Sequence, residues 1–140
     1  MIQVPKLTIE DARKILAGAR RQAEQIGVPM DIAVTDDGGH LLTFERMDGA
    51  KITSIQVAMD KAFTAACTRK GTHEYTQVAG AGGPAFGIFV SNQGRFTIYG
   101  GGLPILVDGV CVGAVGCSSG SVAQDMAVAQ AGIDALLKPS

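Results

Sequence analysis

The C-terminal half of the sequence concentrates residue types that could hold a small anion. Gly100, Gly101 and Gly102 form a triple-glycine turn, and the segment 116–121 leads into a helix start. Glycine adopts positive φ at little cost, so such a turn can point successive N–H groups inward, and a helix N-terminus adds further donors. Together they predict a pocket for a carboxylate, although tight turns and close packing also explain any single glycine.

Polar side chains complete this predicted pocket. Arg46 and Lys61 lie in apolar sequence and are candidate anion partners, with a solvated surface charge as the alternative for each. Ser118 and Ser119 are interpreted as caps or hydroxyl donors, because no paired base is identifiable. Lys61, Asp125 and Arg46 are the candidates for a catalytic role. The predicted ligand-binding set is Arg46, Lys61, Gly100, Gly101, Gly102, Leu103, Pro104, Ser118, Ser119, Gly120 and Asp125.

The two histidines are the side chains whose ordinary pKa suits proton transfer near neutral pH. His40 and His73 are also candidate axial ligands for heme iron, and an exposed histidine without a special role is the alternative for each. The sequence contains no HExxH and no histidine–carboxylate cluster, so we predict no metal site. The glycine-rich nucleotide motifs are also missing.

Composition narrows the class of protein. The 140 residues suit one domain, which we expect to span 1–140. The 12 basic and 13 acidic residues nearly cancel and form no basic stripe, so nucleic acid is not an expected partner. No apolar stretch is long enough to span a bilayer, and the N-terminus lacks an apolar signal region. We therefore expect a cytoplasmic protein without membrane contact.

Three cysteines, widely spaced, do not suggest a disulfide framework. Cys111 and Cys117 are six residues apart on one predicted strand, so we expect them on the same face but about 20 Å apart. They cannot pair locally.

Periodicity predicts the elements that position these residues. A capping box at Thr8 and Asp11 opens a helix that ends at Gly27, and Ser121 with Gln124 opens the last helix. Between them we expect a hairpin around the turn 36–39, a helix from Ile52 that ends before Gly71, a loop through 80–84, a strand at 95–99, and a hairpin around 108–109. The short connections predict an antiparallel sheet packed by helices, an α+β fold.

Three segments together resemble the GlcG/HbpS family, which also includes the C-terminal domain of PduO. They are 44–49 (FERMDG), 99–105 (YGGGLPI) and 109–120 (GVCVGAVGCSSG) followed by Gln124-Asp125. The resemblance covers nearly the whole chain. It implies a profilin-like α/β/α domain with a five-stranded antiparallel sheet flanked by helices, assembled as a dimer, tetramer or octamer.

Function is less narrowly defined by this resemblance. Some members bind heme, and many are encoded beside genes of catabolism. Our first hypothesis is a homo-oligomeric binding protein for a small ligand, with heme or another tetrapyrrole as the candidate cofactor. An enzyme without a cofactor, acting on a small carboxylate-bearing catabolic intermediate, is the second hypothesis, and a non-catalytic accessory or assembly protein is the third.

Overall fold

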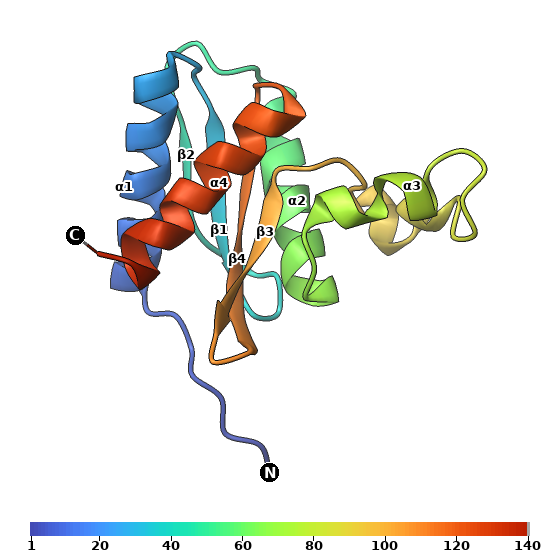
Figure 1. The fold of residues 1–140 in the computed structure, drawn as a ribbon, viewed down its shortest axis with the longest axis horizontal. Coiled ribbons are helices and arrows are strands. Elements are labelled where there is room, and N and C mark those ends of the chain that lie inside the picture. The colour runs from blue at the N-terminus through green and yellow to red at the C-terminus, as the bar shows by residue number, and fades with distance from the viewer. Residues whose placement is uncertain (140) are drawn as a thin grey trace.

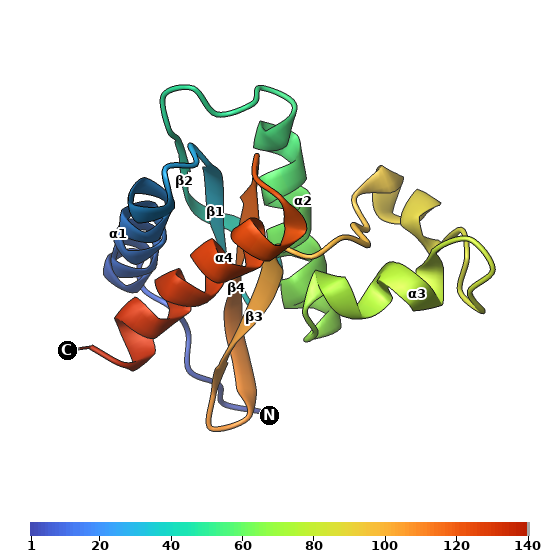
Figure 2. The ribbon, with the colours of Figure 1, turned by 45° about the horizontal axis from the view of Figure 1, so that its top comes forward.

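The computed structural model describes residues 1–139 (Figure 1). Three helices and two hairpins make up the body. Their order along the chain is α1 (Ile9–Ile26), β1 (Asp31–Asp36), β2 (Leu41–Arg46), α2 (Ser54–Thr68), β3 (Gly102–Val107), β4 (Val110–Ser118) and α4 (Val122–Leu137). Helix α2 separates the two hairpins, and α1 and α4 stand at the two ends. The segment between α2 and β3 contains four short helical turns: η1 (Thr72–Tyr75), α3 (Thr76–Ala79), η2 (Ile88–Val90) and η3 (Asn92–Gly94). We call this segment, residues 72–99, the arm, because it projects sideways from the body (Figures 1 and 2).

The predicted capping boxes define the helix starts. The Thr8 hydroxyl accepts a hydrogen bond from the Asp11 N–H at 3.1 Å, and the Asp11 carboxylate accepts one from the Thr8 N–H at 2.8 Å. The Thr8 N–H and the Thr8 hydroxyl both donate to the Asp11 carboxylate at 2.8 Å, and they lower the pKa of Asp11. Ser121 and Gln124 form the same reciprocal pair at the start of α4. Gly27 ends α1 in the left-handed conformation, with φ of 69°.

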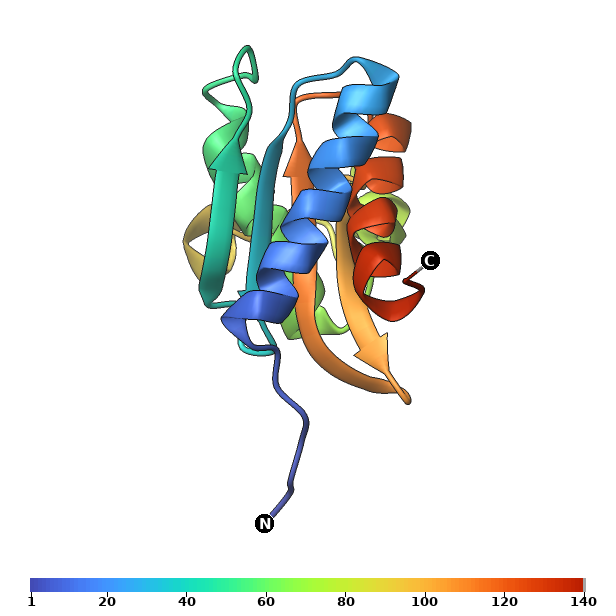
Figure 3. The same cartoon turned by 90° about the vertical axis from the view of Figure 1, so that its left-hand side faces the viewer.

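The four strands form one antiparallel sheet in the order β2-β1-β4-β3. Helices α1 and α4 cover one face and α2 covers the other (Figure 3). The main core lies between the sheet and the α1–α4 pair, where Ile15, Ile32 and Val115 are fully buried. On the opposite face, α2 buries only small side chains and one lysine: Ser54, Ala58, Lys61, Ala62, Thr64, Ala65 and Ala66. The predicted start of this helix at Ile52 is two residues early, and Ile52 is exposed.

The expected fifth strand at 95–99 is absent from the sheet, which has four strands in the described residues. Phe96 and Ile98 are buried and alternate with less buried neighbours, as in a strand. However, this segment satisfies its backbone with side-chain hydroxyls instead of a neighbouring strand. The Thr97 N–H donates to the Thr64 hydroxyl at 2.9 Å, and Thr76 donates to the Ile98 carbonyl at 2.6 Å.

The expectation that Cys111 and Cys117 share a face is also wrong. The pairing of β3 with β4 shifts between Ile105 and Leu106, and this irregularity lies between the two cysteines. Because side chains alternate along a strand, a one-residue shift moves a side chain to the other face. Cys111 approaches the Ala66 carbonyl of α2, whereas Cys117 belongs to the core on the α1–α4 side. All three cysteines are free thiols.

Thr64→Val tests how the arm is attached to α2. The substitution keeps the shape of the side chain but leaves the Thr97 N–H without its partner, so we expect a loss of about 1–2 kcal/mol in unfolding free energy. We also expect faster hydrogen exchange across 95–99. Thr68→Val is the control, because the Thr68 hydroxyl bonds only within α2. Equal exchange rates in the two variants would contradict the attachment.

Candidate functional site

A buried ion pair occupies the centre of the predicted pocket. Lys61 of α2 and Asp125 of α4 are each 3% exposed, and the Lys61 Nζ lies 2.8 Å from Asp125 Oδ2. The same ammonium donates to the Cys117 carbonyl of β4 at 3.0 Å. Asp125 Oδ1 accepts from the Gly120 N–H at 2.9 Å. Both charges are therefore neutralised and hydrogen-bonded inside the protein, which is the condition for burying them.

The triple-glycine turn lies directly against this pair. Gly101 has φ of 128°, and a β-carbon there would lie 2.7 Å from Lys61 Nζ and 2.9 Å from Asp125 Cβ. A β-carbon on Gly102 would collide with the Lys61 backbone carbonyl. Glycine is required at both positions because the chain passes so close to Lys61 and Asp125. The turn thus surrounds the Lys61 side chain instead of an open cavity.

The remaining members of the predicted set divide between two places. Leu103 and Pro104 are the second and third residues of β3, paired with Val115 and Ala114 of β4. Ser118 donates to the Ser54 hydroxyl at 3.1 Å, and Ser119 accepts from the Lys51 N–H at 3.0 Å. Ser118 therefore connects β4 to the start of α2, and Ser119 connects the turn after β4 to the segment before α2. In the described residues neither hydroxyl forms a hydrogen bond with Lys61.

The sequence Gly116-Cys117-Ser118-Ser119-Gly120 also has the G-x-S-x-G spacing of a nucleophile elbow. Ser118 is 6% exposed, and it is Ser119, not Ser118, that has the unusual φ of 109°. Within residues 1–139, neither hydroxyl forms a hydrogen bond with a histidine. The geometry assigns a linking role to these hydroxyls.

Burial also raises the pKa of the neighbouring Cys117 thiol far above its ordinary value, and Asp125 adds to the rise. Cys117 is therefore a neutral core side chain and not a thiolate nucleophile.

Asp31 is a buried charged residue that the sequence interpretation missed. It is fully buried at the start of β1, and neither carboxyl oxygen has a hydrogen-bond partner in the described residues. Burial raises the pKa of Asp31, and the nearby Arg46 partly opposes the rise. The sequence pattern puts Met30, Ile32 and Val34 on one face of β1 and Asp31 on the other. That second face is covered by α2, so the burial of Asp31 depends on a helix that is distant in sequence.

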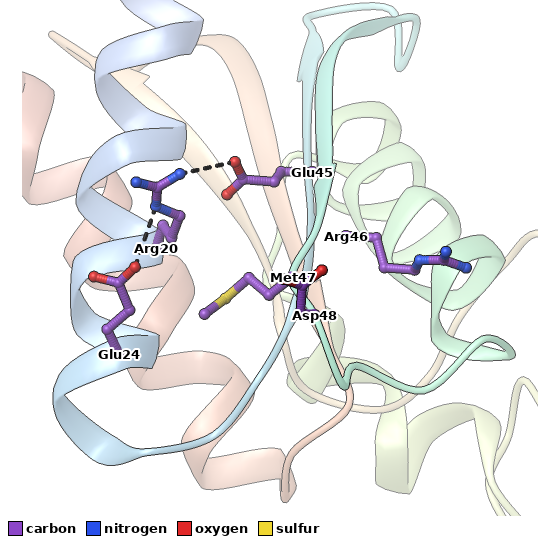
Figure 4. Close-up of a pocket in the computed structure, with 6 residues that line it drawn as sticks. All are labelled: Arg20, Glu24, Glu45, Arg46, Met47 and Asp48. Carbon is purple, nitrogen blue, oxygen red and sulfur yellow. Dashed lines mark hydrogen bonds and ion pairs between the residues drawn. The ribbon is translucent and has the colours of Figure 1, made fainter.

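A cavity of about 450 Å³ lies between α1 and the end of β2. Its lining is charged: Arg20 bonds to Glu45 at 3.1 Å and to Glu24 at 3.4 Å, and Arg46, Met47 and Asp48 complete the lining. The Arg46 side chain points away from Arg20 and Glu24, toward the side of the sheet that carries α2 (Figure 4). Arg46 therefore lies near Asp31 and does not join Lys61 in one site.

The histidines lie in different surroundings. His40 is 82% exposed in its side chain and lies 3.3 Å from Asp36 in the β1–β2 turn. His73 lies at the base of the arm beside Gly100: a β-carbon on Gly100 would lie 3.2 Å from His73 Cβ, 2.7 Å from Val122 and 2.9 Å from the Met126 sulfur. His73 is therefore an exposed imidazole with apolar neighbours.

These features define an α+β domain in which a four-stranded antiparallel sheet lies between one helix and a helix pair, closed by a buried Lys–Asp pair at a glycine turn. The family model described as "Haem degrading protein HbpS-like" matches residues 7–134. The chain belongs to this HbpS-like family, which confirms the resemblance found in the sequence.

Individual relatives agree with this assignment. An uncharacterized 15.0 kDa protein from the dhaT-dhaS intergenic region of Citrobacter freundii is 40% identical over 94% of this chain and 93% of its own length. The crystal structure of the Klebsiella pneumoniae protein ORFY has a TM-score of 0.96 and 35% identity, over 100% of this chain and 97% of that one. The crystal structure of a PduOC:heme complex has a TM-score of 0.89 and 34% identity, over 94% and 95%. In residues 1–139 of this chain, the helices are all too short or too polar to cross a membrane.

The Lys61–Asp125 pair gives a direct stability prediction. Lys61→Met or Asp125→Asn leaves one buried charge or polar group without its partner, so we expect each to lower the unfolding free energy by about 3–5 kcal/mol in urea denaturation. The double variant should recover part of this loss because no unpaired charge remains. Lys14→Met, an exposed lysine on α1, is the control. Additive losses in the double variant would show that the two residues are not coupled.

Proposed function

We propose that this chain binds heme or a closely related tetrapyrrole at the base of the arm, with His73 as the ligand of the iron. The proposal is supported by the heme complex of the PduOC relative, which resembles this chain over nearly its full length. The family description also names heme. Binding is the step that any heme-degrading activity would require first.

The chemistry of the residues around His73 suits such a ligand. A tetrapyrrole needs a large apolar contact surface and, for its iron, a donor such as a neutral imidazole nitrogen. His73 is exposed, and so is Val122, which lies with it against Gly100 and is 47% exposed. Tyr99, the residue before Gly100, is 59% exposed. Exposed apolar side chains grouped beside an imidazole are unusual on a surface that binds nothing.

A shallow apolar groove extends this surface along the arm. Its volume is about 270 Å³, and Phe89, Phe96, Ile98 and Tyr99 form most of its lining. This groove offers apolar area that a macrocycle would cover, and His40 has no comparable surroundings.

We also propose that copies of the chain associate as a homo-oligomer through the exposed apolar side chains of the arm. Such an assembly would remove from water the side chains of Val78, Phe86 and Val90. We propose further that this oligomer works in the cytoplasm in support of catabolism. Sedimentation equilibrium measures the copy number, and a monomer at all concentrations would refute the association.

Hemin titration tests the proposed ligand. We expect a saturable, stoichiometric Soret shift in the unmodified protein. In His73→Ala the position of the band should change and the affinity should fall at least about tenfold, since an axial bond is lost. His40→Ala is the matched control and should behave as the unmodified protein. Absence of the shift would refute heme binding, and a shift unchanged in His73→Ala would refute the assigned ligand.

A further inference from the structure

Two ionisable side chains that have no hydrogen-bond or ion-pair partner in the described residues, Asp31 and Arg46, face each other across the β1–β2 pair. Asp31 is directly opposite Arg46 in the strand register. The next pair on the same face, Ala33 and Phe44, packs against α2, so Asp31 and Arg46 also lie on the α2 side. Nevertheless no ion pair joins them, and Arg46 extends outward over this face (Figure 4).

Two hydroxyl groups and a helix start border the same position. Ser118 of β4 is opposite Asp31 on its other side, and the Ser118 hydroxyl lies 3.1 Å from that of Ser54, the first residue of α2. Helix α2 has 15 residues, and no side chain caps its N-terminus. Its first turn therefore adds partial positive charge at this end of the sheet.

Asp31 and Asp125, the two acidic residues that are buried in the described part of the chain, show why this place is unusual. Asp125 has an ammonium partner on one oxygen and an N–H partner on the other. Asp31 is buried to the same degree and has neither. A buried polar group without a partner costs about 1–3 kcal/mol or more, so its persistence calls for a partner that is not part of the chain.

We propose that Asp31, Arg46, Ser54 and Ser118 form a binding site for the carboxylate group of a small acid. The guanidinium of Arg46 supplies a positive charge and a forked pair of donors for one carboxylate. Asp31 donates its O–H to the same carboxylate when it is protonated, the form that its burial favours, and the two serines supply hydroxyl groups. One negative charge on the ligand then matches the one positive charge of Arg46. This site is separate from the proposed heme surface and does not depend on it.

Access to the site requires movement of the segment Met47–Thr53, which crosses this end of the sheet between β2 and α2 (Figure 2). The segment is held to the body by the Met47 N–H on the Met30 carbonyl and by the Lys51 N–H on Ser119. Ile52 within it is 74% exposed. Few contacts and high exposure are the features of a segment that opens at low cost.

Binding should depend on pH through Asp31. The groups near Asp31 are Arg46 on β2, the uncharged Ser118 on β4 and Ser54 on α2, and the exposed Asp48 and Lys51 of the covering segment. Burial favours the protonated form and Arg46 opposes it. Because the ligand carboxylate and an ionised Asp31 would repel each other, affinity should fall as pH rises, approaching about tenfold per pH unit above the pKa of Asp31.

The test is an amide NMR titration of the heme-free protein with sodium acetate, at constant ionic strength, between about pH 5 and pH 8. We expect saturable shifts at Ser54 and Ser118, with affinity that declines as pH rises. Asp31→Asn keeps a hydrogen-bond donor without a charge, so this variant should bind acetate with an affinity that does not change with pH. Arg46→Gln should weaken binding at least about tenfold. Arg20→Gln, the other arginine of the adjacent cavity, is the matched control and should bind as the unmodified protein does.

Three outcomes would overturn the proposal. They are the absence of saturable shifts, equal affinity in Arg46→Gln, and the same pH slope in Asp31→Asn as in the unmodified protein. Two further titrations identify the source of the carboxylate. Displacement of acetate by hemin from the unmodified protein would assign the site to a tetrapyrrole propionate, and its failure would assign the site to a free acid. Inorganic phosphate should compete weakly at the upper end of this pH range, where it carries a second charge that has no partner here.

Discussion

The burial of Lys61 against Asp125 is the constraint on which the arrangement of the elements depends. The pair joins α2 on one face of the sheet to α4 on the other, and the Cys117 carbonyl and the Gly120 N–H add β4 and the turn between β4 and α4 to the same network. An ammonium and a carboxylate leave water only when nearly all of their hydrogen-bonding capacity is used. Four segments must therefore meet at one point, and their approach cannot vary by much.

This constraint explains residue choices around it. The chain must pass over Lys61 closely enough that Gly101 and Gly102 have no room for a β-carbon. For the same reason α2 lies so near the sheet that Gly116 contacts the backbone of Ala58 and Ala62. The small side chains of α2 follow from this proximity, whereas larger side chains fill the α1–α4 side. The two faces of one sheet thus have different packing distances.

Local signals in the sequence were sufficient for the fold but not for every contact. Capping boxes at Thr8 and Ser121 and the Asp108-Gly109 turn act through neighbouring residues, so their prediction succeeded. The strand expected at 95–99 does not form. The alternation of buried side chains there reflects packing against the rest of the arm and a hydrogen bond to Thr64, which is distant in sequence. Lys61 and Asp125 were both named as candidates, but their direct pairing 64 residues apart has no local signal. Asp31 was missed because its burial depends on α2.

The arm is bounded by Gly71 and Gly100. Its two ends meet beside Lys61, where the Thr72 hydroxyl accepts a hydrogen bond from the Gly102 N–H at 3.0 Å. No strand of the sheet comes from the arm, and the three helices that cover the sheet lie outside the arm. The body is therefore packed on both faces without the arm. An insertion attached at two neighbouring points can change without disturbing the rest of the fold. Its length and side chains can diverge while the scaffold stays the same, and one scaffold can then present different contact surfaces to different ligands.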